Sequence, residues 1–388
     1  MQYRTDPKTG KQLSALGFGC LRFHKDIAEV ERQICFAIDK GVNYFDTAYS
    51  YGKSEAVLGK ILAKDGLRER VNIATKLPYY GVKKPEDFDR LFNTQLERIQ
   101  TDRVEYYLIH ALPGVQSWKW LCEMGIAAWV QKKRDAGQIG QIGFSFHGTG
   151  PDFLELIDAY DWDFCLIQYN YYDINYQAGK RGLDYATERG IPVMVMEPLR
   201  GGMLVNKLPP AVSGLWASAP GERSPAEWAL RWVLDHPNVL TVLSGMGTME
   251  MVEENVRVAA DHMPGTFTEE DLARYDEART LIRAATKVDC TGCGYCMPCP
   301  QGVDIPLCLG CLNDTAFRKR WKSQYWYVAT TEGHNASRCN GCGLCEPLCP
   351  QGIPVRKMLK ETVRLLERPP YKVMRAVARR MLKHKAEK

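Results

Sequence analysis

The chain has 388 residues, of which 45% are hydrophobic and 25% charged, so it is long enough for one large globular domain and a smaller one. This composition excludes a largely disordered chain. The net charge of +5 is unevenly distributed, because residues 356–388 hold twelve Lys or Arg against three Glu. The basic character therefore belongs to the C-terminal tail, and the preceding residues are slightly acidic.

The N-terminal residues carry no sign of export or membrane insertion. Residues 1–6 lack the apolar region of a signal peptide, and no stretch reaches the roughly eighteen uninterrupted apolar residues of a membrane span. Ten of the fourteen cysteines lie between residues 290 and 349, and thiolate clusters need a reducing compartment. We therefore expect a cytoplasmic protein without a membrane span.

The chain opens with a predicted β-hairpin over residues 3–16. Eight strand-like runs follow, and they alternate with helical patterns. The predicted strands are Leu16–Gly19, Asn43–Ala48, Val71–Lys76, Glu105–His110, Ile142–His147, Cys165–Asn170, Pro192–Glu197 and Val239–Gly245. The predicted helices are Asp26–Lys40, Glu55–Lys64, Pro85–Ile99, Trp120–Ala136, Asp152–Tyr160, Tyr176–Arg189, Pro225–His236 and Met249–Ala260. Eight βα units predict an α/β fold, a (β/α)8 TIM barrel.

A doubly wound open sheet is the alternative for alternating strands and helices. Its first strand should lead into a Gly-x-Gly-x-x-Gly phosphate-binding turn. Here Gly17-Phe-Gly19 is followed by Cys20-Leu-Arg22, so the third glycine is missing. The number of units and the missing motif favour the barrel.

Ionisable residues stand at the ends of successive predicted strands. Asp46 ends the second strand, Lys76 the third and His110 the fourth, and Tyr51 follows Asp46 in the next loop. Barrel active sites collect at the carboxyl ends of the strands, so these four side chains should meet at one mouth. A lysine beside a tyrosine favours the phenolate form, and a carboxylate can hold that lysine. The group would then donate a proton to a carbonyl oxygen.

These residues resemble the aldo/keto reductase family over roughly residues 13–280. The resemblance rests on Gly17-Phe-Gly-Cys-Leu-Arg22, Asn43-Tyr-Phe-Asp46-Thr-Ala-Tyr-Ser-Tyr51-Gly, Ala74-Thr-Lys76, Leu108-Ile-His110, Gly143-Phe-Ser145-Phe-His, Ile167-Gln168-Tyr-Asn170-Tyr-Tyr, Met196-Glu-Pro198-Leu-Arg-Gly-Gly and Glu254-Asn255. It implies that Tyr51 is the general acid/base, that Lys76 and Asp46 tune it, and that His110 orients the carbonyl. It also implies a nicotinamide cofactor, NAD(P)(H), and a small carbonyl or alcohol substrate.

The resemblance further implies contacts to the cofactor. Ser145 and Gln168 match the residues that hold the nicotinamide carboxamide, and Asn255 matches an adenine contact. Met196 stands where an aromatic ring commonly stacks on the nicotinamide, and Leu199 is a further expected contact. A methionine there would stack more weakly than an aromatic ring.

One departure from the family pattern concerns the choice between NAD and NADP. Reductases selective for NADP place a lysine after the last barrel strand and an arginine further along, where both charges hold the 2′-phosphate. Counting back from Asn255, these positions hold Gly245 and Met251. We therefore expect no strong preference for NADP.

Two cysteine runs near the C-terminus have the spacing of a bacterial two-cluster ferredoxin. Three cysteines at three-residue steps bind one [4Fe–4S] cluster, and a fourth, before a proline, crosses to the other cluster. The ligands predicted for the first cluster site are Cys290, Cys293, Cys296 and Cys349. The ligands predicted for the second cluster site are Cys339, Cys342, Cys345 and Cys299. The first run has two rather than three residues before its last cysteine, which leaves the pairing of Cys299 open.

Other roles for these cysteines fit less well. A disulfide framework is disfavoured in a long chain without a signal peptide, and structural zinc usually takes separated Cys-x-x-Cys pairs. The additional pair Cys308-Leu-Gly-Cys311 is either an alternative source of ligands or a packed pair. Packing is favoured, because the two runs already supply eight thiolates.

The sequence thus predicts three parts: a barrel over residues 1–284, a small α+β ferredoxin-like domain over residues 285–355, and a basic helical tail over residues 356–388. Their combination also resembles a ferredoxin-containing branch of the aldo/keto reductase family. Residues 268–283 should form a helix outside the barrel, and the Trp- and Tyr-rich insertion 306–338 should cover the clusters or dock on the barrel. For the tail, a helix covering the cluster domain is favoured over one that meets an acidic partner or a membrane.

The first functional hypothesis is an oxidoreductase that interconverts a carbonyl and an alcohol and is coupled to electron transfer through two [4Fe–4S] clusters. Hydride carries two electrons and a cluster accepts one, so a flavin is an additional cofactor to consider. The alternative is an electron-transfer or scaffold protein whose barrel has lost catalysis, against which the complete set of four residues argues. A redox partner protein is expected, and nucleic acid is not.

Overall fold

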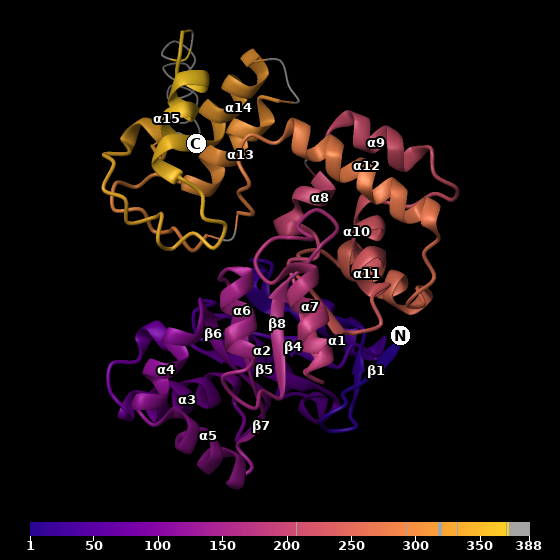
Figure 1. Ribbon diagram of the computed structural model, residues 1–388, viewed down its shortest axis with the longest axis vertical. Helices are drawn as coiled ribbons and strands as arrows, with labels where there is room; N and C mark the ends of the chain where they lie inside the picture. Colours follow the sequence, from indigo (N-terminus) through magenta and orange to yellow (C-terminus); the bar gives the residue numbers. More distant parts are fainter. Residues whose placement is uncertain (207, 293, 317–319, 332, 370, 372–388) are drawn as a thin grey trace. The chain divides into compact units, whose positions relative to one another are not determined.

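The computed structural model describes residues 1–206, 208–292, 294–316, 320–331, 333–369 and 371, and its course is drawn in Figure 1. The chain divides into two compact units. The first comprises Met1–Leu199 and Arg223–Glu269, and the second comprises Arg200–Glu222 and Glu270–Lys388. The domain boundaries after residues 284 and 355 stay predictions.

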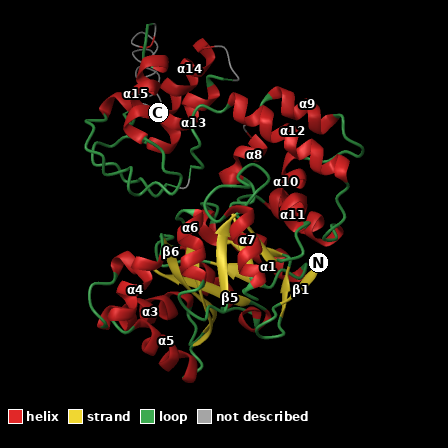
Figure 2. Ribbon diagram, viewed as in Figure 1, coloured by secondary structure: helices red, strands yellow, loops and turns green. Residues whose placement is uncertain are grey.

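The first unit contains a closed barrel of eight parallel strands, preceded by an antiparallel hairpin of β1 (Tyr3–Thr5) and β2 (Gln12–Ser14). The barrel strands are β3 (Leu16–Gly19), β4 (Tyr44–Asp46), β5 (Asn72–Leu77), β6 (Val104–Leu112), β7 (Ile139–Phe146), β8 (Phe164–Gln168), β9 (Val193–Met196) and β10 (Val239–Ser244). β10 pairs with both β3 and β9, which closes the sheet. The predicted barrel is confirmed, and its strands are drawn in yellow in Figure 2.

Helices alternate with these strands along the chain. Those in the first unit are α1 (Ile27–Asp39), α2 (Ser54–Leu62), α3 (Glu86–Ile99), α4 (Val115–Glu123), α5 (Ile126–Asp135), α6 (Gly150–Ile157), α7 (Gly179–Glu188), α10 (Pro225–Leu234) and α11 (Met249–Asp261). α1 shows why they form where they do. The Asp26 side chain accepts from the N–H of Ala28 and caps the helix, and buried side chains recur along one face at Val30, Ile34 and Ala37.

One predicted helix is wrong in its extent. The segment predicted as a single helix over Trp120–Ala136 is two helices, and the first of them begins earlier, at Val115. Gly125, between them, has φ +89°, a left-handed conformation that suits glycine and ends α4. The broken helix still spans the connection from β6 to β7.

Large aromatic side chains fill the interior of the barrel. The Tyr44 and Tyr106 rings lie 5.1 Å apart between centroids, and the Tyr106 and Phe164 rings 5.2 Å apart, both edge to face. These rings are fully buried with Leu108, Leu166 and other apolar side chains. The interior is therefore packed, and polar groups are left for the carboxyl ends of the strands.

The second unit is built from helices and loops. Its helices are α8 (Met203–Asn206), α9 (Pro210–Ala217), α12 (Glu269–Ala285), α13 (Ile305–Asp314), α14 (Arg320–Thr331) and α15 (Val355–Leu366). Tyr275 of α12 packs on Trp216 of α9, with ring centroids 5.4 Å apart. In the described residues no strand follows β10, so the expected α+β character is corrected to helical. The cysteine runs form tight turns at glycines and prolines instead of extended pairs.

The insertion and the tail take part in the core of this unit. The insertion contributes α13 and α14, and α15 begins the tail and buries Val355, Leu359 and Leu366. The remainder of the predicted helical tail, residues 372–388, falls outside the described residues. Within the described part of the chain, no helix combines the length and the apolar content that a bilayer crossing needs.

Candidate functional sites

Three predicted site residues lie toward the carboxyl ends of adjacent barrel strands. Asp46 is the last residue of β4, Lys76 lies in β5 and His110 lies in β6. The residues two positions before each of them belong to the barrel interior; these are Tyr44, Ala74 and Leu108. Because side chains alternate along a strand, Asp46, Lys76 and His110 continue the inward face.

Lys76 and Asp46 form a buried ion pair. The Lys76 ammonium donates to Oδ1 of Asp46 at 2.5 Å and to the carbonyl oxygen of Thr47 at 2.7 Å. Lys76 is 1% exposed and Asp46 is 4% exposed, so neither charge is solvated and each depends on the other. Burial raises the pKa of the Asp46 carboxyl, and the charge and hydrogen bond of Lys76 oppose that rise.

Tyr51 completes the predicted group of four. It lies in the turn between β4 and α2, where its N–H donates to the carbonyl oxygen of Ala48 at 3.0 Å. The Lys76 Nζ atom lies 4.8 Å from the centroid of the Tyr51 ring. The His110 ring lies 5.7 Å from the same ring between centroids, at an interplanar angle of 80°. The fold therefore brings all four side chains together at one end of the barrel.

His110 is held as a neutral imidazole near neutral pH. Burial, followed by the positive charge of Lys76 and the proximity of His147, lowers its pKa well below the usual value. Its Nδ1 lies 3.2 Å from the hydroxyl oxygen of Ser50, the residue before Tyr51. A neutral imidazole can donate one hydrogen bond to a substrate oxygen while its other nitrogen contacts a hydroxyl.

His147 and Ser50 are site residues that sequence reasoning missed. His147 was not assigned to the site from the sequence, yet its proximity contributes to the lowered pKa of His110. Burial lowers the pKa of His147 to about 4, and a hydrogen bond with Gln177 opposes that shift. The available signal was strand alternation, because His147 follows Ser145 by two positions and so continues the same face.

A pocket in the second unit brings the two cysteine runs together. Cys290 and Cys296 of the first run and Cys349 of the second run all line it. The other lining residues include four buried apolar side chains; these are Ile305, Leu309, Ile353 and Val355. A first-run pair beside the last cysteine of the second run is the arrangement that the crossed assignment requires. Cys293 lies outside the described residues.

The second cluster site has a matching arrangement. Burial, together with the charges of Glu346, Cys339 and Cys299, raises the pKa of the Cys345 thiol, so those cysteines lie close to it. Cys299 thus lies with the second run despite the shortened spacing before it. Cys342, the remaining predicted ligand, is exposed.

The cysteine loops are supported by hydrogen bonds to the helical core. Asn313 of α13 accepts from the N–H groups of Lys287 and Val288 at 3.1 and 3.0 Å, which fixes the chain entering the first run. The Tyr327 hydroxyl of α14 accepts from the N–H of Ala336 at 2.8 Å, just before the second run. Both loops are therefore held by the insertion between them.

Cys308 and Cys311 belong to the core of this unit. They lie in α13 at 0% and 2% exposed, among the apolar side chains of the helices. The Cys308 thiol contacts the carbonyl oxygen of His334 at 3.6 Å, and burial raises its pKa. This placement supports the packed alternative. Among the described residues, no three His, Cys, Asp or Glu side chains converge as a single metal ion would need.

Comparison with known proteins identifies both parts of the chain. A model of the aldo/keto reductase family matches residues 15–280. The chain belongs to the aldo/keto reductase family. A model of a 4Fe-4S dicluster domain matches residues 289–354, which supports iron–sulfur clusters in the second unit. The protein is therefore an aldo/keto reductase-type oxidoreductase with a ferredoxin-type domain.

Similar sequences and a solved structure agree with this family. The chain is 31% identical over 235 residues to an aldo-keto reductase of Mycolicibacterium vanbaalenii, covering 60% of this chain and 78% of the relative. It is 26% identical over 302 residues to the uncharacterized oxidoreductase YrpG of Bacillus subtilis, covering 66% and 90%. The holo form of aldo-keto reductase AKR11C1 from Bacillus halodurans superposes with a TM-score of 0.60 at 24% identity, over 72% of this chain and 96% of that chain. This last likeness shows the fold.

Two expected cofactor contacts of this aldo/keto reductase lie at strand ends beside the four residues. The Ser145 hydroxyl, in β7, accepts from the N–H of Ala111 at 2.7 Å. Gln168 ends β8, and its amide is held at both ends. It donates to Asp173 Oδ2 at 2.8 Å and accepts from the Gln177 side chain at 3.1 Å. Both side chains are buried and fixed in orientation, as recognition of a carboxamide requires.

The other expected contacts are spread along the same end of the barrel. Met196 ends β9 and is half-buried, and Leu199 follows in the next loop, also half-buried. Asn255 lies in α11, where its amide donates to the Ser244 hydroxyl at 2.9 Å. The two positions of the missing phosphate clamp, Gly245 and Met251, lie in the loop after β10 and on α11.

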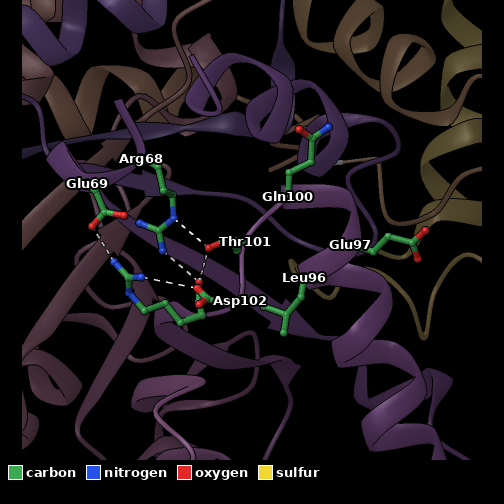
Figure 3. A pocket seen from close by; sticks show the side chains of 8 residues that line it. Arg68, Glu69, Leu96, Glu97, Gln100, Thr101 and Asp102 are labelled. Carbon is green, nitrogen blue, oxygen red and sulfur yellow. Dashed lines mark hydrogen bonds and ion pairs between the residues drawn. The ribbon is translucent and has the colours of Figure 1, made fainter. Parts of the chain in front are cut away.

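A hollow elsewhere on the barrel carries charged side chains that pair with one another (Figure 3). Arg68 pairs with Glu105 at 2.9 Å, and Arg103 pairs with Glu69 at 2.8 Å. Arg68 also donates to the hydroxyl of Thr101 at 3.1 Å. These residues lie just before β5 and at the start of β6, so they lie at the end of the barrel opposite to Lys76 and His110. The hollow is therefore stabilised by its own ion pairs and supports no additional site.

Proposed function

We propose that this protein is a NAD(P)(H)-dependent reductase that interconverts a carbonyl and an alcohol and exchanges electrons with two [4Fe–4S] clusters. The observation that carries the proposal is the buried Lys76–Asp46 pair beside the Tyr51 ring, with neutral His110 on another side of that ring. A buried ion pair is costly to keep, and its position next to a phenol gives it a chemical use.

The proposed chemistry follows from these positions. Tyr51 transfers a proton between its hydroxyl and the substrate oxygen, and the Lys76 ammonium stabilises the phenolate that this transfer leaves. Asp46 holds Lys76 in place and balances its charge. His110, as a neutral imidazole, donates a hydrogen bond that orients the carbonyl. The nicotinamide, when bound, supplies or accepts the hydride.

Ser145 and Gln168 fit a nicotinamide carboxamide, because both present buried polar groups in fixed orientations. The amide of Gln168 cannot rotate freely between Asp173 and Gln177. Met196 and Leu199 would supply apolar contact, and Asn255 would meet the adenine. Neither Gly245 nor Met251, the two positions that commonly hold the 2′-phosphate, carries a charge, so NAD and NADP should bind with similar affinity.

The cysteine groupings fit two clusters. We infer that Cys290, Cys293, Cys296 and Cys349 hold one and that Cys299, Cys339, Cys342 and Cys345 hold the other. The shared pocket of Cys290, Cys296 and Cys349 and the proximity of Cys345 to Cys339 and Cys299 support this division. The clusters supply one-electron transfer when bound. A flavin that converts hydride into single electrons is the alternative route of coupling, and mass spectrometry of released cofactors distinguishes the two.

The proposal is tested by Tyr51→Phe in anaerobically purified protein with a panel of aldehydes and ketones. Carbonyl reduction should fall by about 100-fold or more, because the proton donor is lost, while nicotinamide affinity should stay nearly unchanged. Tyr49→Phe is the matched control, since its ring lies against Arg98 at 4.4 Å and not in the group of four. Full activity in Tyr51→Phe would reject the assignment. Protein that binds no nicotinamide but has dithionite-reducible clusters would instead be an electron carrier.

A further inference from the structure

The two cluster sites have different surroundings. The pocket at the first site is lined mainly by apolar side chains that are almost fully buried, among them Ile305, Leu309 and Ile353, and by the buried polar side chains of Thr291 and Gln351. At the second site Cys342 is exposed, and the neighbouring Leu344 is 60% exposed. Reduction adds a negative charge to a cluster that four thiolates already make negative. Apolar surroundings oppose that charge, and water favours it.

A charged pair lies beside each of the two cluster sites. At the first site Arg200 pairs with Asp289, the residue before Cys290, at 3.5 Å. At the second site the pair is Arg356 and Glu346. Arg356, the second residue of α15, donates through Nε and Nη2 to Glu346 Oε2 at 3.0 and 2.7 Å. The N–H of Arg356 also donates to Glu346 Oε1 at 3.0 Å. Three bonds therefore fix both side chains, and Glu346 directly follows Cys345 in the chain. The pair is part of the local fold and not a chance encounter of mobile side chains.

The guanidinium of Arg356 is placed over the cysteine loop. A Cβ built on Gly343 would lie 3.5 Å from both Cζ and Nη1 of Arg356, so the guanidinium occupies the space above this glycine. Gly343 stands between Cys342 and Cys345. Hydrogen bonding and charge from Glu346, and then the charges of Cys345 and Cys339, raise the pKa of Arg356. The guanidinium thus interacts electrostatically with Cys345 and Cys339, two of the predicted ligands of the second site.

We propose that the Arg356–Glu346 pair tunes the reduction potential of the second cluster, with the guanidinium raising this potential and the carboxylate lowering it. This inference rests on the proposed ligands of the two clusters. The guanidinium favours the more negative reduced cluster, and Glu346 opposes it by an opposite charge. Each site changes between [4Fe–4S]2+ and [4Fe–4S]+ by taking up one electron, which dithionite supplies in the test below.

The pair allows a test with two opposite signs. Arg356→Gln leaves the Glu346 carboxylate uncompensated and should shift the potential of the second cluster to more negative values. Glu346→Gln leaves the guanidinium uncompensated and should shift the same potential to more positive values. The double variant should return close to wild type, because the two removed charges nearly cancel. The first cluster should not move in any of the three.

The measurement is a potentiometric titration of the anaerobic holoprotein with dithionite, followed by low-temperature paramagnetic resonance and by iron analysis. Arg364→Gln is the matched control, because Arg364 also pairs with a glutamate on α15, at Glu361, and that pair has no cysteine among its charge neighbours. Raised salt should shrink the shifts, since the pair at Arg356 is partly exposed.

The outcomes separate this inference from the proposed function. Two clusters with opposite shifts of one potential in Arg356→Gln and Glu346→Gln support it. The inference is overturned if both clusters are intact and neither variant changes a potential. It is also overturned if Arg364→Gln shifts a potential by as much. In both cases the ligand assignment stands. Iron for fewer than two clusters in the wild-type protein would instead reject the ligand assignment. If Arg356→Gln loses a cluster, Glu346→Gln still decides through the sign of its shift.

Discussion

The barrel mouth and the cysteine loops hold their reactive groups by different means. In the barrel, Asp46, Lys76 and His110 are placed by the parallel register of β4, β5 and β6, and all three side chains are buried. In the second unit, the cysteines lie on loops supported by helices, and several of them are partly exposed. The barrel site therefore depends on a few deeply buried contacts, and the cluster sites depend on which loops lie side by side.

The largest expected effect is at the buried pair. Lys76→Met should abolish detectable carbonyl reduction and lower the free energy of unfolding of the barrel by about 3–5 kcal/mol, because Asp46 is left buried without its partner. Adding Asp46→Asn should restore most of the stability and none of the activity. Denaturant unfolding and turnover measure the two effects, and unchanged iron content is the internal control. Equal stability of Lys76→Met and wild type would contradict the buried-pair account.

The cysteine loops should respond in a different way, by loss of one cluster. Cys349→Ala should remove the cluster whose other ligands lie some fifty residues earlier, and it should leave the second cluster in place. Cys299→Ala should have the reverse effect. The matched control is Cys308→Ala, which removes a buried thiol of α13 and should retain both clusters. Iron analysis and paramagnetic resonance decide, since two reduced clusters interact magnetically. Loss of a cluster in Cys308→Ala would make this cysteine a ligand.

The pH dependence of stability sharpens the contrast at the barrel mouth. The folded pKa of His147 is lowered to about 4, so between the ordinary value and that pH the unfolded chain binds more protons than the folded one. The free energy of unfolding should therefore fall as the pH falls below about 6.5, by up to about 1.4 kcal/mol per pH unit from this residue. The pKa of His110 is also lowered by folding, so this residue contributes to the pH dependence in the same direction. Denaturant titrations at pH 7, 6 and 5 should show a shallower dependence in His147→Phe, and an identical slope would contradict the assignment.

The smallest expected effect is the difference between the two nicotinamides. NADH and NADPH should bind within about tenfold of each other, or about 1.4 kcal/mol, because Gly245 and Met251 offer no charge to the 2′-phosphate. Replacing both by Lys and Arg should shift the preference toward NADPH. A Cβ on Gly245 would meet nothing closer than the carbonyl oxygen of Gly19 at 3.9 Å, so the lysine can be accommodated. Fluorescence titration measures both affinities, and a strong NADPH preference in the wild type would reveal another basic contact.

The barrel could be predicted because its information is local and periodic. Each strand is a short apolar run, and the four reactive residues stand at the ends of such runs, where a barrel must bring them together. The break at Gly125 was missed because the apolar pattern continues on both sides of it. His147 was missed because one histidine on a strand has no distinguishing pattern. Its role depends on neighbours from another strand and a distant loop, which only the fold brings close.

Less of the second unit could be predicted, for a related reason. Cysteine spacing indicates clusters and their crossed ligands, but it contains no information on what surrounds them. The contact of Arg356 with Gly343 joins a helix to a loop residue thirteen positions earlier in the chain, and nothing in either segment marks it. The α+β expectation rested on the resemblance to ferredoxins, whereas the glycine and proline turns and the helices α13 to α15 leave no strand in the described residues.

The central claim, that a working reductase site and the clusters act together in one chain, is tested most directly by one anaerobic mixing experiment. Protein whose clusters have been reduced with dithionite, and freed of excess dithionite, is mixed with oxidised nicotinamide. The account predicts that the nicotinamide binds and that the clusters are reoxidised, with one nicotinamide reduced for every two electrons that the clusters lose. Clusters that stay reduced in protein that binds no nicotinamide would contradict the account and leave an electron carrier with an inactive barrel.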